Sequence, residues 1–375
     1  MEDNVSTFKV PLTTIKDVLV HPNADKLEIA VVYGFNVIVG KGQYVPGDLC
    51  IYCPIDSILP MDLETKLFSG PDSKIKLNKG RIKQIKIRGA YSQGLLIGLE
   101  HIPQGILFGT EIETDLAETL KITKYEPPTP GFQSPGKKRD KPRENPFFHV
   151  YGGIDNFKWY PDLFAEGEEV SITEKIHGSN IRFGLVPYVA NNTWRKLLKF
   201  FKLVPEFEWV YGSNRVQLQQ RWNYKGWYGE DVYGKVLKKY KVREKVAPGE
   251  IWYGELYGDG IQKNYSYGCE NGEHKLVVFD LKYQFGDTSF YADADNFFEI
   301  SRERGFKTPP ELYRGLFNKE ATKALTAGDS VLVPDQKVRE GVVVKSLKET
   351  NSIIGRKVLK LISEKYLEAD NSDFH

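Results

Sequence analysis

Short apolar stretches, separated by glycine and proline turns, run along most of the chain. In the N-terminal part, Phe35-Asn-Val-Ile-Val39 comes directly before a Gly-Lys-Gly turn, Leu49-Cys-Ile-Tyr-Cys53 follows a Pro-Gly-Asp turn, and residues 94–99 form another apolar run. Strands of this length at this spacing predict a small β-barrel or sandwich. The two cysteines at Cys50 and Cys53 are three positions apart on one strand, so we expect them to face opposite sides and not to share a metal.

The C-terminal part is also expected to consist mostly of strands, with a few helices. Residues 293–304 begin with an aspartate, carry apolar residues on one face and end before Gly305, which predicts a helix, and residues 318–327 predict a second, shorter one. The expected fold class is therefore a strand-rich α+β fold, with antiparallel sheets and flanking helices in its second half.

A proline-rich, basic segment divides these two parts. Residues 127–146 hold six of the chain's 20 prolines and the basic run 136–143. Proline removes backbone donors and like charges repel, so this segment is not expected to pack as a helix or strand. The pattern predicts a barrel domain at 1–120, a linker at 121–148 and a second domain at 149–375.

Composition excludes several classes of protein. The 375 residues hold 52 Lys and Arg against 50 Asp and Glu, and only three cysteines, so the chain has no disulfide framework and no overall charge that selects a partner. No apolar run approaches the roughly 20 residues of a membrane span, and the polar N-terminus is unlike a secretory signal. We expect a protein of a reducing compartment, cytoplasmic or nuclear, that is not secreted and binds no membrane.

One local stretch of charge favours a nucleic-acid partner. Residues 73–99 contain no acid and seven basic residues, among them Lys83, Lys86 and Arg88. On a regular strand Lys83 lies on the face opposite Lys86 and Arg88, whereas a β-bulge near Gln84 would bring the three together. With the bulge, the run predicts contacts to a phosphate backbone; without it, the run is a solvated strand face.

The candidate chemistry lies in the second half. A strand at residues 169–173 leads into Glu174-Lys-Ile-His-Gly-Ser-Asn180, a tight turn with the spacing K-x-x-G, which is a weak signal alone. Four later apolar strands each carry one or two charges, at residues 251–258, 274–281, 339–345 and 356–363. Burying isolated charges is costly unless they bind something charged, so these strands indicate a pocket for a charged, metal-bound ligand.

These segments, in this order, resemble the covalent nucleotidyltransferase superfamily of DNA ligases, RNA ligases and mRNA capping enzymes. The resemblance implies that Lys175 is the nucleophile that becomes a lysyl-nucleotide. It implies that Glu255 and Glu340 are the acids of two further motifs, that Phe279 is the aromatic residue between them, and that Lys360, with Lys357, belongs to the last motif.

The order of the domains indicates which family within this superfamily the chain resembles. Residues 21–27, His-Pro-Asn-Ala-Asp-Lys-Leu, look like the opening of tRNA-binding OB-fold domains, and the chain ends 15 residues after Lys360, where DNA ligases and capping enzymes carry a further OB domain. The turn sequence K-x-H-G-S-N is common among RNA ligases. The chain therefore resembles the ATP-dependent RNA ligases with an N-terminal OB domain, often called RNA ligase family 5.

That resemblance implies an enzyme that joins RNA 3′-hydroxyl and 5′-phosphate ends as a monomer, with ATP as substrate and Mg²⁺ or Mn²⁺ as cofactor. It implies that Phe279 and Val343 enclose the adenine, and that Lys345 and Lys360 act on the reacting phosphate and, together with a bound magnesium ion, lower the pKa of Lys175. It also implies that Arg182 and Arg215 contact RNA. The further residues expected to touch the nucleotide are Glu174, Ile176, Gly178, Asn180, Glu255 and Lys357, and those expected at the metal are Glu255, Glu340 and His177.

Two alternatives stay open from the sequence. An RNA capping guanylyltransferase would use the same lysine with GTP, although the position of the OB-like domain argues against it. A catalytically inactive RNA-binding protein would keep the OB domain and lose the chemistry, although Lys175, Glu255, Glu340 and Lys360 are all present.

Overall fold

The computed structural model describes residues 8–68, 77–102, 105, 109–125, 144–190, 197, 200–218 and 228–368. The chain divides into two compact units: an N-terminal unit of Val5–Gln133, Asp155–Asp162 and Leu367–His375, and a C-terminal unit of Met1–Asn4, Ser134–Ile154 and Leu163–Tyr366. Residues 126–143, most of the expected linker, lie outside the described residues, so the boundaries at 120 and 148 stay a prediction.

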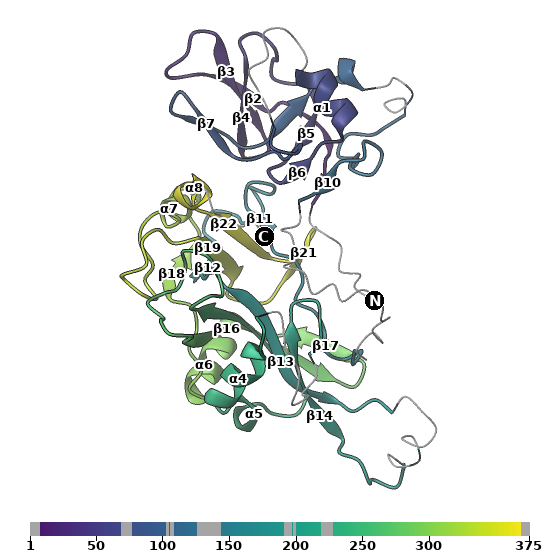
Figure 1. Cartoon of the computed structure of the whole chain (residues 1–375), viewed down its shortest axis with the longest axis vertical. Helices are drawn as coiled ribbons and strands as arrows, with labels where there is room; N and C mark the ends of the chain where they lie inside the picture. Colours follow the sequence, from purple (N-terminus) through teal and green to yellow (C-terminus); the bar gives the residue numbers. More distant parts are fainter. Residues whose placement is uncertain are drawn as a thin grey trace. The chain divides into compact units, whose positions relative to one another are not determined.

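Short antiparallel strands build the N-terminal unit (Figure 1). One sheet has the order β1-β5-β9, another is the meander β2-β3-β4, and β7 pairs with β8 and β6 with β10. The elements are β1 (Leu12–Thr14), β2 (Asp17–Val20), β3 (Leu27–Val32), β4 (Phe35–Gly40), β5 (Leu49–Cys53), β6 (Ser57–Ile58), α1 (Met61–Phe68), β7 (Ile85–Ile87), β8 (Ala90–Ser92), β9 (Leu95–Ile97), the 3₁₀ turn η1 (Leu99–His101), β10 (Thr123–Lys124) and β11 (Asp155–Asn156).

Strand β5 lies between two apolar clusters of this unit. Ile51 and Cys53 pack into one cluster, while Cys50 and Tyr52 pack into the other. Side chains alternate between the faces of a strand, so the two cysteines are separated as the sequence predicts. Both are buried free thiols, and the C-x-x-C spacing is part of the core.

A segment from the far side of the linker completes the second of these clusters. Trp159 is 9% exposed and lies against the rings of Tyr33, Phe35 and Tyr52, at centroid distances of 4.8, 5.2 and 5.4 Å. The Gly34 N–H donates to the carbonyl of Lys158 at 2.7 Å. The N-terminal unit is therefore discontinuous in sequence, which the division into three consecutive parts did not include.

We expect Trp159→Ala to destabilise the N-terminal unit by about 3–5 kcal/mol, because it removes a large buried aromatic side chain from a packed core. Trp159→Phe, which keeps a ring there, should cost clearly less. Hydrogen exchange of the β3 and β4 amides measures the effect in this unit. Equal protection of these amides in both variants and the wild type would show that the segment is not part of the core.

Two antiparallel sheets form the C-terminal unit. The first has four consecutive strands in the order β22-β19-β12-β18, and the second has the order β14-β13-β15-β16-β17. Their strands are β12 (Glu169–Lys175), β13 (Ser179–Pro187), β14 (Phe207–Ser213), β15 (Glu250–Gly258), β16 (His274–Phe285), β17 (Thr288–Tyr291), β18 (Glu311–Leu316), β19 (Gly341–Ser346) and β22 (Val358–Ile362), and β20 (Asn351–Ser352) pairs with β21 (Gly355–Arg356).

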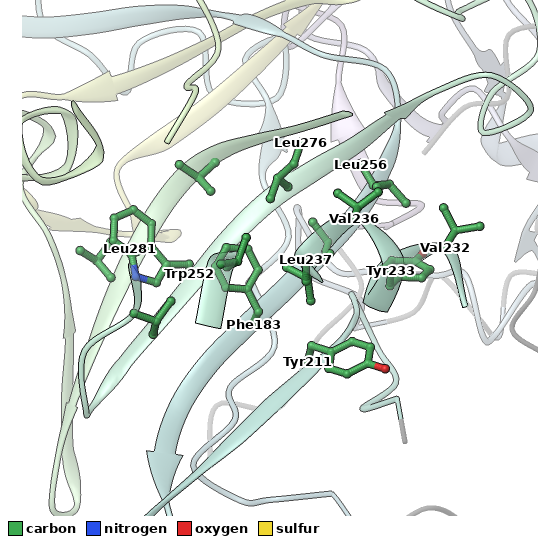
Figure 2. Close-up of a cluster of buried hydrophobic side chains, with 14 of the residues drawn as sticks. Phe183, Tyr211, Val232, Tyr233, Val236, Leu237, Trp252, Leu256, Leu276 and Leu281 are labelled. Carbon is green, nitrogen blue, oxygen red and sulfur yellow. The ribbon is translucent and has the colours of Figure 1, made fainter. Parts of the chain in front are cut away.

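Helices cover one face of the second sheet. Its core includes Phe183 and Trp252 from the strands, Val236 from α4 and Phe297 from α6, and Figure 2 shows the strand side chains meeting those of α4. The helices are α4 (Val232–Lys239), α5 (Val242–Lys245), α6 (Ala294–Glu303), α7 (Lys319–Ala324) and α8 (Glu364–Glu368). Both helices expected from the sequence are present, with Asp293 and Asn318 at their N-caps.

In the part of the chain that the structure describes, no helix combines the length and the apolar character needed to cross a membrane.

Candidate active site

The lysine of the K-x-x-G turn is the last residue of β12, and it forms an ion pair. Lys175 Nζ lies 2.7 Å from Glu340 Oε1, and the two side chains are 23% and 6% exposed. Glu340 directly precedes β19, the neighbouring strand, whose first residue Gly341 is the partner of Lys175 in the ladder. Two residues far apart in the sequence are thus brought together by adjacent strands.

Strand register places further predicted residues on the same face as Lys175. Thr173 is opposite Val343, which is opposite Lys360, and the register partner of Lys345 is Ser171. Side chains of directly opposed residues share a face, so Lys175, Val343, Lys345 and Lys360 project from one side of the sheet. That side is half-buried, whereas the opposite side, with Ile172, Val342, Val344, Leu359 and Leu361, is buried.

Glu255 approaches Lys175 from the second sheet. It lies on β15 opposite Asn180 of β13, and its carboxylate accepts the backbone N–H of Gly178. A Cβ added to Gly178 would come within 2.3 Å of the Leu256 carbonyl, so only glycine allows the turn to pass this close to β15. The K-x-x-G spacing thus joins the two sheets of the unit at the lysine.

The three charged groups shift one another's pKa. Burial raises the pKa of Glu255 to about 8, aided by the negative charge of Glu340 and opposed by Lys175. Burial also acts to raise the pKa of Glu340, but Lys175 and His177 lower it to about 2. Burial acts to lower the pKa of Lys175, but Glu340 and Glu255 raise it above its usual value. The sequence-based expectation of a lowered Lys175 pKa does not hold for the unliganded protein.

The raised pKa of Glu255 predicts a stability change with pH. Between the ordinary pKa near 4.5 and the folded value near 8, the folded state retains a proton that the unfolded state has lost, so this group's contribution to stability falls as the pH rises through that window. Glu255→Gln removes the titration. The variant should therefore gain on the order of 1–2 kcal/mol relative to wild type between about pH 5 and about pH 8.5, allowing for partial exposure. Urea unfolding in EDTA measures this, and a pH-independent difference would contradict it.

The carboxylates fit a divalent cation whose other ligands are mostly water molecules and substrate oxygens. Glu340 Oε2 is buried and has no hydrogen-bond partner within the described residues. Carboxylate oxygens suit Mg²⁺ and Mn²⁺, and Mg²⁺ is typically held by one or two carboxylates with waters and phosphates. No three His, Cys, Asp or Glu side chains gather into a metal cage in the described ranges, which agrees with such a partial site.

The side chains of three predicted residues around Lys175 are buried. Glu174 has the opposite strand parity, is 1% exposed, and its Oε2 accepts the backbone N–H groups of Val331 and Leu332 at 2.7 and 3.1 Å. Its side chain therefore holds a loop, and only its backbone is available to a nucleotide. Ile176 and His177 are each 4% exposed, so neither side chain is open to solvent.

Two lysines expected at the phosphates have carboxylate partners. Lys345 Nζ lies 3.0 Å from Asp280 Oδ1 and 3.4 Å from Glu349 Oε2, so its charge is neutralised locally in the unliganded protein. Lys357 precedes β22 and contacts Glu168 Oε2 at 2.6 Å. On β22, Val358 shares a face with Lys360, whereas Lys357 has the opposite parity. Lys357 therefore does not join Lys360 on the pocket side, as the three-residue spacing indicated.

Phe279 is the extra residue of a β-bulge. Gly254 pairs with Val278 and Tyr253 with Asp280, which leaves Phe279 unpaired between them. Its half-buried ring lies edge-on to Tyr151 at 5.1 Å. Bulges change the direction of a side chain next to functional sites. The enclosure of an adenine by Phe279 and Val343 stays a prediction.

The residues expected to contact RNA divide into buried and exposed. Arg182 is 1% exposed, its Nε donates to the Ser213 carbonyl at 3.1 Å, and its guanidinium lies 4.2 Å from the Phe148 ring. The structure therefore does not support Arg182 as an RNA contact. Arg215 is exposed at the end of β14.

In the N-terminal unit, Lys83, Lys86 and Arg88 are all exposed. Strand β7 begins only at Ile85, and both Ile85 and Lys86 are exposed, so the alternation changes phase at the place where the sequence required a bulge. Lys86 Nζ also lies 2.9 Å from Glu368 Oε1. The structure exposes these three basic side chains but does not show what binds them.

Sequence reasoning missed two sets of residues at this site. One is the ion-pair group around Asp280, where burial acts to raise the pKa of the carboxylate but Arg356 and Lys345 lower it below its usual value. The sequence signal that could have indicated this group is the pair of charged residues at 280 and 356, each in an otherwise apolar strand. The other set is Tyr265, Tyr267 and Tyr366, which surround His177 and lie in a loop and a terminal helix without periodicity.

Comparisons with known proteins agree with this geometry. An OB-fold domain model matches residues 10–99, and the RNA ligase family model matches residues 168–362, about half of the chain and all of the motifs above. The chain therefore belongs to the RNA ligase family. A search of curated proteins finds no significant match.

Solved structures give the same fold over nearly the whole chain. A Naegleria gruberi RNA ligase mutant with ATP and Mn is 21% identical, with a TM-score of 0.72 over 96% of this chain and 98% of that one. The same ligase with pyrophosphate is 21% identical with a TM-score of 0.71, covering 96% and 97%, and a mutant with AMP and Mn is 20% identical with a TM-score of 0.72, covering 96% and 98%. The expected fold class, an OB-fold domain before a ligase domain of antiparallel sheets, is confirmed.

Proposed function

We propose that this chain is an ATP-dependent RNA ligase that seals a 3′-hydroxyl to a 5′-phosphate through a lysyl-adenylate at Lys175. The observation that carries the proposal is the ion pair of Lys175 with Glu340, with Glu255 held against the same turn by Gly178. This arrangement presents a half-buried amine between two carboxyl groups on the open face of a sheet. The solved relatives are structures of an RNA ligase of the same fold with ATP and Mn, with AMP and Mn, and with pyrophosphate.

In the first step, Lys175 Nζ attacks the α-phosphorus of ATP, a P–N bond forms and the bond to pyrophosphate breaks. Attack requires the neutral amine, so Lys175 must first lose the proton that its ion pair stabilises. Glu340 Oε1, 2.7 Å from the amine, is the nearest acceptor for that proton. A divalent cation, held by Glu340 and Glu255 through waters, would supply positive charge at the phosphates.

In the later steps, the adenylate moves from Lys175 to an RNA 5′-phosphate, and a 3′-hydroxyl then displaces AMP. Lys360 projects from the same sheet face as Lys175, two strands away, where its ammonium can face the anionic phosphate. Lys345 shares that face, and we propose that it exchanges Asp280 for phosphate when substrate binds.

The test is incubation with α-labelled ATP or GTP and Mn²⁺, followed by RNA that carries a 5′-phosphate. We expect label from ATP on the protein, transfer to the RNA end, and sealed product. Label from GTP alone would favour the capping alternative. RNA binding without label from either nucleotide would favour the inactive binding protein.

We also propose that the N-terminal unit binds the RNA backbone through Lys83, Lys86 and Arg88. Replacing all three by Gln should weaken RNA binding and reduce the slope of log affinity against log salt by roughly 2–3, because each lost phosphate contact releases about 0.7–0.9 fewer counterions. Lysyl-adenylate formation should hardly change.

Replacing the exposed Lys16, Lys26 and Lys41 in the same way is the matched control. If both triple variants bind RNA with the same affinity and salt slope as wild type, the basic run is a solvated surface. An equal loss in both would mean that general charge, not this run, binds RNA.

The monomeric state and a reducing compartment, cytoplasmic or nuclear, remain our proposals. Cys50, Cys53 and Cys269 support the second, since all three are buried free thiols.

A further inference from the structure

The histidine of the nucleophile turn is enclosed by tyrosines. The His177 ring meets the rings of Tyr265 and Tyr366 edge-on, at centroid distances of 5.0 and 5.3 Å. Its backbone N–H donates to the Tyr267 hydroxyl at 2.8 Å. With 4% of its surface exposed, His177 is fixed from three sides.

The enclosed ring also lies against the acid that pairs with Lys175. The Tyr366 hydroxyl lies 3.3 and 3.2 Å from the two ring nitrogens of His177 and hydrogen-bonds with the ring. His177 Nδ1 lies 3.6 Å from Glu340 Oε2, while Glu340 Oε1 contacts Lys175. The contact to Glu340 is longer than a hydrogen bond, so it acts electrostatically and sterically on the carboxylate.

One of these tyrosines also holds the backbone that leads to Glu340. The Tyr265 hydroxyl donates to the carbonyl of Val338 at 2.9 Å. Val338 has a φ of 62°, a conformation that costs a β-branched residue of order 1–3 kcal/mol and persists only where the surroundings impose it. Because Val338 is two residues before Glu340, this contact helps to fix the backbone position from which the Glu340 side chain extends.

We propose that His177 and its three tyrosines form a positioning unit that fixes Glu340 against Lys175, and that His177 does not bind the metal. This rests on the proposed lysyl-adenylate chemistry. It replaces the sequence-based expectation of His177 at the metal, because the Tyr366 hydroxyl engages the ring nitrogens. Tyr265, Tyr267 and Tyr366 become residues that act on the reaction through Glu340.

The experiment uses the full chain with Tyr265→Phe, Tyr366→Phe and His177→Gln. Each Tyr→Phe change keeps the ring and removes one hydroxyl. Tyr52→Phe is the matched control, since Tyr52 is buried in the N-terminal unit and its hydroxyl also donates to a backbone carbonyl, that of Gln93, at 2.7 Å. Single-turnover formation of the lysyl-adenylate is measured at saturating ATP across a Mn²⁺ titration.

We expect Tyr265→Phe, Tyr366→Phe and His177→Gln to slow the step about 10–100-fold at saturating metal, the usual cost of losing an orienting contact. Saturating Mn²⁺ should not restore the rate, because a bound cation does not rebuild the contacts that hold Glu340 against Lys175, and Tyr52→Phe should react normally. A wild-type rate in both tyrosine variants would overturn the proposal. So would recovery of His177→Gln at high Mn²⁺, which would place His177 at the metal.

A second readout needs no metal and no turnover. In protein with ¹⁵N-labelled histidine in EDTA, Tyr366→Phe should shift the ring-nitrogen signals of His177, and Tyr52→Phe should leave them in place. Unshifted signals in Tyr366→Phe, or an equal shift in Tyr52→Phe, would contradict the proposal. If wild type forms no adduct from ATP, the proposed function fails, while this readout still decides whether the tyrosines engage His177.

Discussion

Lys175→Ala is expected to form no covalent nucleotide with ATP, and to seal no RNA that lacks a previously adenylylated end. The reason is that no other group replaces the amine in the P–N bond. A denaturing gel after incubation with α-labelled ATP measures the loss directly. The matched control is Lys275→Ala, which removes a lysine that is 32% exposed and paired with Glu273 at 3.5 Å, away from the turn.

Folding of the Lys175 variant needs its own measurement. Removing one partner of a buried ion pair leaves an uncompensated charge, here on Glu340, and costs up to about 3–5 kcal/mol in fully buried cases. Because Lys175 is 23% exposed, we expect a smaller cost, visible as a lower unfolding temperature. Sealing of a pre-adenylylated RNA end by Lys175→Ala would show that the variant is folded, and a normal yield of adduct would refute the assignment.

Glu340→Gln should slow lysyl-adenylate formation by about 10²–10³-fold, the range found when one preorganised electrostatic contact to a reacting centre is removed. Glutamine keeps the size of the side chain but loses the charge that orients Lys175 and attracts a cation. The rate should stay low across a full Mg²⁺ titration. A wild-type rate at every Mg²⁺ concentration would remove Glu340 from the reaction.

Glu250→Gln is the control for that substitution. Glu250 is also buried and paired, with Arg304 and with the indole N–H of Trp252, but it lies at the first residue of β15, away from Lys175. It should lower the free energy of unfolding without slowing adenylylation. Comparing the two variants separates loss of a buried charge from loss of a catalytic one.

The parts of the site that could be predicted from sequence are those fixed by strand parity. Lys175, Val343 and Lys360 fall on one sheet face because alternation and register decide which way a strand residue points. The same rule indicated that Lys357 would not accompany Lys360. It left open whether the strand alternation changes near Gln84, and in the structure Ile85 and Lys86 are both exposed.

The contacts missed from the sequence depend on tertiary packing. Nothing local indicates that Trp159 completes a core formed mainly by residues 15–52, or that Tyr366 reaches His177. The lowered pKa expected for Lys175 counted the lysines on its sheet face and a bound magnesium ion, and it missed the carboxylates beside the amine. In the structure its nearest charge is Glu340, and Lys345 is neutralised by Asp280.

The most direct measurement of the central claim is peptide mapping by mass spectrometry after incubation with ATP and Mn²⁺. The account predicts one AMP adduct, acid-resistant as a phosphoramidate is, on the peptide that contains Glu174-Lys-Ile-His-Gly178 and localised by fragmentation to Lys175. AMP on any other lysine, or a GMP adduct formed from GTP in its place, would contradict it.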